Sequence, residues 1–306
     1  MTGLTKTEDT TTVPGYTIVK WVYSAAPGTD TWTPPTGVGS VMVLNVAGGA
    51  GSGRGNSYPG GGGAGGLVFK PAQAVTPGNA VTVTVGAGGP GYVVEEQTAA
   101  NNGGNSVFDT LIAYGGGYPG DLFVASSTGG SGGGGSGYLN TGGSAATQPG
   151  SETGGYGNAG GNGVSGSPYP GGGGGGAGAA GSGRQGGIGL KEVTISTVTY
   201  NFYTIFGAVG DVQGTEAYFA GGGSGTTTPG SDTLAGGLGG GGRSALTLRD
   251  AMPNTGGGGG GVYDAAPDDT TGSGGPGIVI IKYLTPSGSS EAGCSLGSAN
   301  MMVGGM

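Results

Sequence analysis

Hydrophobic and β-branched residues gather near the two ends of the chain. Residues 16–23 (YTIVKWVY) and 40–46 (SVMVLNV) have the composition of strands, and residues 67–69 add a short one. Residues 81–85 alternate valine with threonine, the period of a strand with one buried face. The last strong segment is 277–283 (GIVIIKY). We predict that it pairs with the N-terminal strands, so that both chain ends build one small β-structure.

Runs of glycine dominate the region between these strands. The longest uninterrupted runs have six glycines and cover residues 171–176 and 256–261. Glycine brings no side chain to bury and loses the most backbone entropy on ordering, so such a run forms neither α-helix nor strand by propensity. Further runs, with small interruptions, cover 60–66, 115–117, 129–137, 150–163, 171–183, 221–225, 236–242, 256–261 and 272–277. They follow no fixed period, which excludes collagen and a fixed-length solenoid.

These runs are either disordered or held together by their backbones. Glycine and proline make up 85 and 17 of the 306 residues, a composition typical of disorder, but only 8% of residues are charged, which disfavours it. A polyproline II helix has three residues per turn and no internal hydrogen bonds, so its N–H and C=O groups point outward. Without Cβ atoms, neighbouring helices can approach and bond on several sides. We therefore predict a mainly β and irregular fold with a stacked bundle of polyglycine II helices, inserted loops and almost no α-helix.

The remaining segments complete one predicted domain over residues 16–283. Within the longest insertion, residues 191–206 predict a β-hairpin or an edge strand pair, and residues 245–250 allow one helical turn. Residues 1–15 are expected to form a tether or docking arm, with a frayed terminus as the alternative. Residues 284–306 are expected to form a flexible or docking tail, in which Met301 and Met302 could anchor to a partner chain.

Charge and residue counts exclude several classes of protein. The net charge of −8, with nine Lys and Arg, disfavours nucleic acid and anionic membranes as partners. Histidine is absent, which removes the commonest general base and metal ligand, and the single cysteine, Cys294, excludes an intramolecular disulfide. No stretch is long and apolar enough to span a membrane, and the N-terminus lacks a signal peptide, so we expect synthesis in a cytoplasm.

Motifs that suggest chemistry are weak. Residues 51–55 (GSGRG) lack the Gly-Lys-Ser/Thr and helix of a phosphate loop. The acidic pair Glu95 and Glu96 does not set the spacing of a glycosidase, and Asp264 with Asp268 and Asp269 lacks the calcium-loop pattern. We therefore predict no enzyme, no metal site and no cofactor.

Tyrosines beside the glycine runs are the more useful signal. An exposed tyrosine offers a large contact area and a hydroxyl group at low entropic cost, which suits recognition of sugars or protein loops. The same rings could instead cap the bundle and shield its backbone from water, and both interpretations stay open. The candidate receptor-binding residues are Tyr92, Tyr118, Tyr138, Tyr156, Tyr169, Tyr263 and Asp264.

An ordered series of motifs between residues 16 and 283 resembles the glycine-rich domain of bacteriophage tail and fibre proteins. The motifs are 32–38 (WTPPTGV), the strand ending at Val46, the run at 60–66, 77–89 (PGNAVTVTVGAGG), 103–108 (GGNSVF) and 274–283 (GGPGIVIIKY). The alternation of glycine runs with diverse loops is similar to the receptor-binding adhesins at the tips of T-even-type phage long tail fibres.

This resemblance implies a virion adhesin, made in the host cytoplasm and placed on the tail or fibre. Its partners would be a bacterial surface glycan or outer-membrane protein, together with other virion proteins. The alternative is a structural virion protein, such as a fibre segment, plug or decoration, without a receptor. An adhesin should gather its loops and tyrosines at one end, away from residues 2–15. Ice binding ranks last, because the threonines cluster irregularly.

Overall fold

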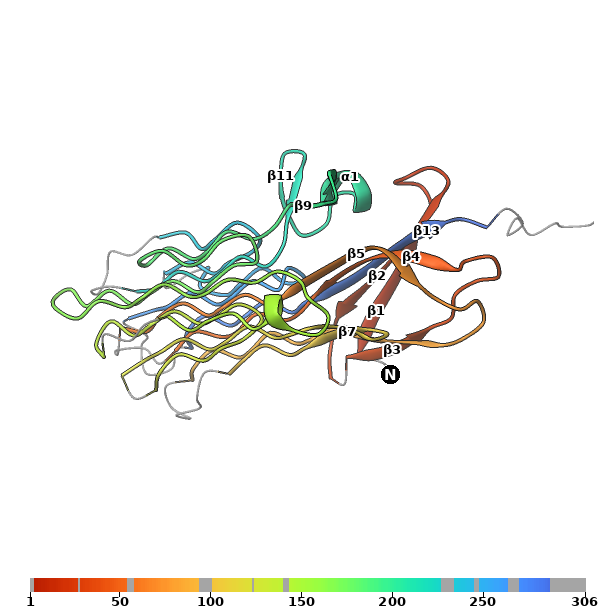
Figure 1. The fold of residues 1–306 in the computed structure, drawn as a ribbon. Coiled ribbons are helices and arrows are strands. Elements are labelled where there is room, and N and C mark those ends of the chain that lie inside the picture. The colour runs from red at the N-terminus through yellow and green to blue at the C-terminus, as the bar shows by residue number, and fades with distance from the viewer. Residues whose placement is uncertain are drawn as a thin grey trace, which may run out of the picture.

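The computed structural model describes residues 3–26, 28–53, 58–93, 101–122, 124–139, 143–226, 234–244, 248–263 and 270–286. Strands gather at one end of the molecule, which we call the proximal end, and glycine-rich segments extend from it towards a distal end (Figure 1). The elements are β1 (Leu4–Asp9), β2 (Tyr16–Tyr23), β3 (Thr29–Trp32), β4 (Ser40–Val46), β5 (Leu67–Ala74), β6 (Val81–Thr84), β7 (Ser106–Phe108), β8 (Leu111–Ala113), the 3₁₀ turn η1 (Gln148–Gly150), β9 (Glu192–Ile195), β10 (Val198–Asn201), α1 (Phe202–Phe206), β11 (Asp211–Gln213), β12 (Glu216–Tyr218) and β13 (Ile278–Leu284).

Both ends of the chain build the main sheet, as the sequence predicted. The strand order is β1-β2-β13-β4-β5, and β13 lies between β2 and β4, antiparallel to both. Val279 and Ile281 face a second sheet, of order β3-β6-β7-β8, across one core, whereas Ile278 and Ile280 face α1 across another. A strand buried on both faces needs apolar residues at every position, which explains the unbroken run in residues 278–281.

The N-terminal segment is more ordered than a frayed end. Part of the expected arm, Leu4–Asp9, pairs as edge strand β1 with β2 from Leu4 opposite Tyr23 to Asp9 opposite Ile18. Residues 287–306, which include Cys294, Met301 and Met302, lie outside the described residues. Residues 245–247, the first half of the expected helical turn, also lie outside them. Residues 248–250 are not helical.

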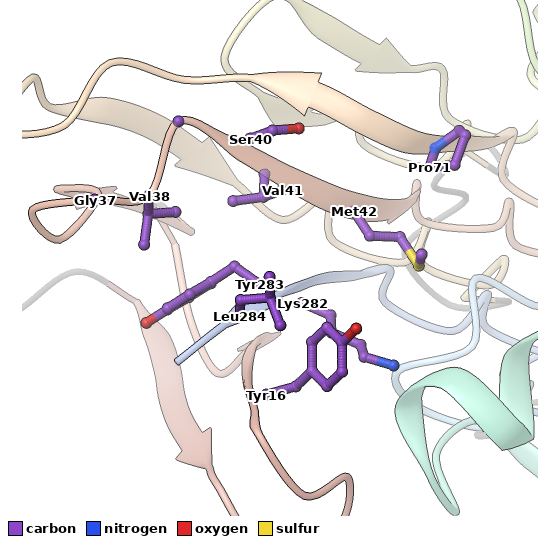
Figure 2. Close-up of a pocket in the computed structure, with 11 residues that line it drawn as sticks. Tyr16, Gly37, Val38, Ser40, Val41, Met42, Pro71, Lys282, Tyr283 and Leu284 are labelled. Atoms are coloured by element: carbon purple, nitrogen blue, oxygen red, sulfur yellow. The ribbon is translucent and has the colours of Figure 1, made fainter. Parts of the chain in front are cut away.

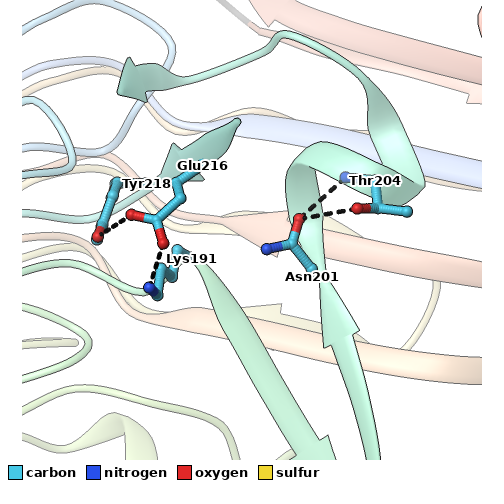
Figure 3. A network of polar contacts seen from close by, with 5 residues as sticks. All are labelled: Lys191, Asn201, Thr204, Glu216 and Tyr218. Carbon is cyan, nitrogen blue, oxygen red and sulfur yellow. Dashed lines mark hydrogen bonds and ion pairs between the residues drawn. The ribbon is translucent and has the colours of Figure 1, made fainter. Parts of the chain in front are cut away.

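The long insertion is a small unit packed beside the main sheet. The predicted hairpin is confirmed as β9 and β10, but the prediction of strand was wrong for residues 202–206, which form α1. Asn201 caps this helix, because its side chain accepts a hydrogen bond from the Thr204 amide at 3.0 Å (Figure 3). Residues 202–206 have side chains that favour strands, but burial of Phe202 and Phe206 in the core stabilises the helix.

The glycine runs form the predicted bundle, and their hydrogen bonds repeat every three residues. In residues 60–65, the amides of successive residues donate to three different segments, and every third amide returns to the same segment. The amides of Gly60 and Gly63 donate to the carbonyls of Gly120 and Gly117, and those of Gly61 and Ala64 donate to Gly172 and Gly175. The amides of Gly62 and Gly65 donate to Gly259 and Gly256, and all six N–O distances are 2.9–3.0 Å. This is the period of a polyproline II helix.

The carbonyls of the same run bond to three further segments. The amides of Gly134 and Ser131 donate to the carbonyls of Gly61 and Ala64, respectively, and the Gly223 amide donates to Gly62. The amides of Ala50 and Ala47 donate to the carbonyls of Gly63 and Gly66. The run is therefore surrounded by six neighbours, each linked through the backbone. The run at 171–177 donates with the same period, to residues 220–226, 132–135 and 179–183. We call these segments glycine helices and their assembly the glycine bundle.

The direction of the chain places the ends of several glycine helices at the distal end. Residues 47–53 lead away from β4 and residues 58–66 return to β5, so Gly53 and Tyr58 are distal. In the same way, residues 86–93 and 256–263 lead towards the distal end, and residues 101–105 and 270–277 return from it. Strand β1 and the end of β13 lie at the proximal end (Figure 1).

Candidate functional site

Four tyrosine rings meet at the distal end of the bundle. Tyr58 is 5.2 Å from Tyr169 and 4.6 Å from Tyr263, and Tyr138 is 5.9 Å from Tyr169, measured between ring centroids. The order of contacts is thus Tyr263, Tyr58, Tyr169 and Tyr138, which we call the tyrosine row. Adjacent rings are tilted by 41°, 44° and 34°. The row is a continuous aromatic surface rather than a flat stack.

Each ring of the row stands at the end of a different glycine helix. Tyr58 and Tyr169 precede runs that return to the proximal end, while Tyr138 and Tyr263 follow runs that leave it. Backbone bonds tie these ends together. The Gly137 amide donates to the carbonyl of Tyr58 at 3.1 Å, so the turns that carry Tyr58 and Tyr138 are held in register. The bundle therefore fixes the position of the row.

The two central tyrosines have unusual backbones. Tyr58 has φ of 50° and Tyr169 has φ of 53°, in the left-handed region that side chains other than glycine rarely adopt. Each precedes a proline, Pro59 or Pro170, which restricts its backbone further. A bulky residue in this conformation costs on the order of 1–2 kcal/mol. Strain of this kind persists where surrounding structure imposes it, and it is enriched at functional sites.

The row is both linked internally and open to solvent. A hydrogen bond with Tyr263, followed by burial, raises the pKa of the Tyr58 hydroxyl. Tyr138 is 53% exposed, and its neighbour Leu139 is 44% exposed. Val164 is 52% exposed, and its amide donates to the carbonyl of Pro170 beside Tyr169. An aromatic surface with exposed aliphatic neighbours is thus available for binding.

The other described candidates, Tyr92, Tyr118 and Tyr156, are not among the four rings of the row. The Tyr92 side chain is 4% exposed, too little to bind a large ligand, and its amide donates to Thr271 Oγ1. Tyr118 is half-buried, and its amide donates to Asn102 Oδ1. Tyr156 pairs with Leu67 at the proximal end, where burial raises its pKa. Asp264 lies outside the described residues.

Sequence reasoning missed Tyr58, which contacts two other members of the row. A signal was present, because the triplet Tyr-Pro-Gly starts at Tyr58, Tyr118 and Tyr169. Two of these three tyrosines have positive φ, and both belong to the row. At Tyr58 and Tyr169 the triplet starts a returning glycine helix, whereas at Tyr118 it lies at the end of an outgoing one.

A groove of about 390 Å³ lies at the opposite, proximal end. Its lining residues come from the ends of the main sheet and the loop before β4 (Figure 2): Tyr16, Gly37, Val38, Gly39, Ser40, Val41, Met42, Pro71, Lys282, Tyr283 and Leu284. Lys282 Nζ lies 4.4 Å from the centroid of the Tyr16 ring, and burial lowers the pKa of Lys282. This groove therefore combines apolar side chains, polar groups and one cation.

The described residues contain no group of three or more His, Cys, Asp or Glu side chains that could hold a metal ion. Within the described part of the chain, no helix has the length and apolar character needed to cross a lipid bilayer.

Comparison with known families identifies the domain. The family model of the glycine-rich domain matches residues 24–284, and the chain belongs to this family. No curated protein matches the chain. The family match confirms the glycine-rich domain that the sequence motifs predicted, and the narrower likeness to phage fibre tips stays a prediction.

Proposed function

We propose that this protein is a bacteriophage adhesin, located on the tail or fibre of the virion, that binds a receptor on the bacterial surface through its distal loops. The main support is the convergence of Tyr58, Tyr138, Tyr169 and Tyr263 at the end of the molecule opposite β1. A receptor-binding protein must hold its recognition surface away from the end by which it is attached. The tyrosine row meets this requirement.

The construction of the bundle suits this work. Backbone hydrogen bonds between glycine helices hold the scaffold, so the turns at their ends can vary in sequence without disturbing it. The left-handed backbones of Tyr58 and Tyr169 further support a binding role, since the fold tolerates a cost there that glycine would avoid.

The proximal end suits attachment to other tail or fibre proteins. Strand β1 lies at the edge of the main sheet, and the groove beside Leu284 offers apolar side chains and the Lys282 ammonium group. A partner segment with an apolar side chain next to a carboxylate would match it. This assigns the two ends of the molecule to two different tasks.

A structural virion protein, such as a fibre segment, plug or decoration, is the second candidate. The contacts within the tyrosine row favour it, because Tyr58, Tyr169 and Tyr263 are half-buried against one another and could serve as a lid on the bundle. Under this alternative, the rings protect backbone hydrogen bonds from water and recognise nothing. Neither candidate is an enzyme or needs a cofactor.

The test is binding of purified protein to host cells. Fluorescently labelled protein should coat bacteria that support infection by the phage encoding it, and an excess of unlabelled protein should block adsorption of that phage. Bacteria that resist adsorption serve as the control. Absence of binding to every strain that supports infection would overturn the adhesin and leave the structural alternative.

A further inference from the structure

We infer that the tyrosine row binds a linear, uncharged glycan lying along it. This inference deepens the proposed function and rests on it. A sugar ring has an apolar C–H face and a hydroxyl-bearing edge, so it matches an aromatic ring that also carries a hydroxyl. Four such rings in a continuous row offer successive places to a chain of sugars.

The geometry of the row favours an extended ligand. The three successive aromatic contacts run from Tyr263 through Tyr58 and Tyr169 to Tyr138, so the four side chains form an open line. In a parallel stack, each ring would cover the face of its neighbour. The tilts of 34–44° between adjacent rings leave part of each face uncovered. A chain of sugars can therefore contact several rings at once.

Charge favours an uncharged ligand. The segments that carry the row contain no Asp, Glu, Lys or Arg, over residues 58–60, 136–139, 162–171 and 260–263. The whole chain has a net charge of −8, which repels anionic polymers. Within these described segments, the groups that can recognise a ligand are the tyrosine rings, by apolar contact, and their hydroxyls, by neutral hydrogen bonds.

The repetition of one side chain along the row favours a repeating ligand. The row offers four tyrosines in successive contact, with Leu139 and Val164 exposed beside it. A strip that gains affinity by repeating one weak contact suits a polymer with a repeating unit.

Treatment of host cells separates the two receptor classes. Mild periodate cleaves vicinal diols in sugars, whereas protease removes exposed protein. We expect periodate to abolish binding of the labelled protein and protease to leave it unchanged. Protein-free polysaccharide purified from the same cells should compete for binding. If untreated cells are bound but this polysaccharide is neither bound nor able to compete, the inference is overturned and a protein receptor replaces it. If untreated cells are not bound, the proposed function itself fails.

Variants assign the binding to the row. Tyr138→Ala removes an exposed ring, and Tyr169→Gly removes a ring while keeping a residue that accepts positive φ. Each should weaken polysaccharide binding at least ~10-fold, as expected at a hot spot. Tyr203→Ala, on α1, is the matched control and should bind like the wild type. Full binding by Tyr138→Ala and Tyr169→Gly, at unchanged melting temperature, would overturn the assignment. If Tyr169→Gly keeps full binding but melts much earlier, the row is a cap and not a binding site.

Discussion

A Cβ atom on Gly174 would lie 1.9 Å from the carbonyl oxygen of Gly62, on a neighbouring glycine helix. The Gly174 amide is held on another side by the carbonyl of Gly223 at 2.8 Å, and Gly223 in turn donates to Gly62 at 3.0 Å. The three backbones therefore fix one another, and none can retreat without breaking a bond. At this contact the absence of a side chain is a condition of the fold.

Substituting Gly174 should therefore destabilise the whole domain. We expect Gly174→Val to lower the free energy of unfolding by at least ~3 kcal/mol, the upper part of the range for overpacking. Gly174→Ala should act in the same direction, because the clash involves Cβ itself. Gly150→Ala is the control, since a Cβ there has nothing within 4 Å. Equal melting temperatures for Gly174→Val and wild type would mean that the run is only a linker.

Gln148 closes the proximal end of the bundle with its side chain. It is fully buried; its Oε1 accepts from the Tyr114 amide at 2.7 Å, and its Nε2 donates to the carbonyl of Gly154 at 2.7 Å. We expect Gln148→Leu to cost about 2–3 kcal/mol, because buried backbone groups lose their partners. Gln73→Leu at the edge of the main sheet is the control. Unfolding in denaturant measures the stability of both variants. If Gln148→Leu unfolded at the same denaturant concentration as Gln73→Leu, Gln148 would not have this role.

Asp211 joins the insertion to the bundle. Its Oδ2 accepts from the amides of Gly239 and Gly240 at 2.8 and 3.2 Å, in a turn where both glycines have positive φ. Asp211→Ala should lower the free energy of unfolding by about 2–3 kcal/mol, the range for hydrogen bonds to a charged group. Asp211→Asn keeps one acceptor and should lose less. If the two variants were equally stable, these hydrogen bonds would not hold the turn.

Glu216 should make stability depend on pH. Hydrogen bonds from Lys191 and then Tyr218 lower the pKa of Glu216 from its ordinary 4.5 (Figure 3). Because the folded carboxyl has the lower pKa, its contribution is fully present above pH 4.5 and is lost as pH falls through the folded-state value. Glu216→Gln should therefore melt slightly below wild type at pH 7, and the difference should close in acid. The effect is small because the carboxylate is exposed to solvent. A difference that is constant with pH would contradict it.

The sequence was sufficient for strands β2, β4 and β13 because they carry side-chain patterns, whereas β1 was expected to be a docking arm. Residues 278–281 are apolar at every position, which marks a strand covered on both faces, and such a strand needs neighbours on both sides. Residues 202–206 misled the prediction because their aromatic and β-branched side chains favour strands. Only the Asn201 cap indicated a helix there.

The sequence predicted that the glycine runs form a bundle of polyglycine II helices, but not which runs lie next to one another. A run such as residues 60–66 has no side-chain pattern that specifies its neighbours, so its six partners follow from the loop lengths and from the strands to which it is joined. For the same reason the sequence could not show which tyrosines meet. Tyr138, Tyr169 and Tyr263 converge with Tyr58, while Tyr156 lies at the other end.

Hydrogen exchange of the glycine amides is the most direct test of the central claim, that backbone hydrogen bonds between glycine helices replace a conventional core. Mass spectrometry at neutral pH should find residues 60–66 and 171–177 protected as strongly as β2 and β13, because their amides are buried and bonded in the same cooperative unit. Exchange of both runs within the dead time, with β2 and β13 protected, would contradict the account.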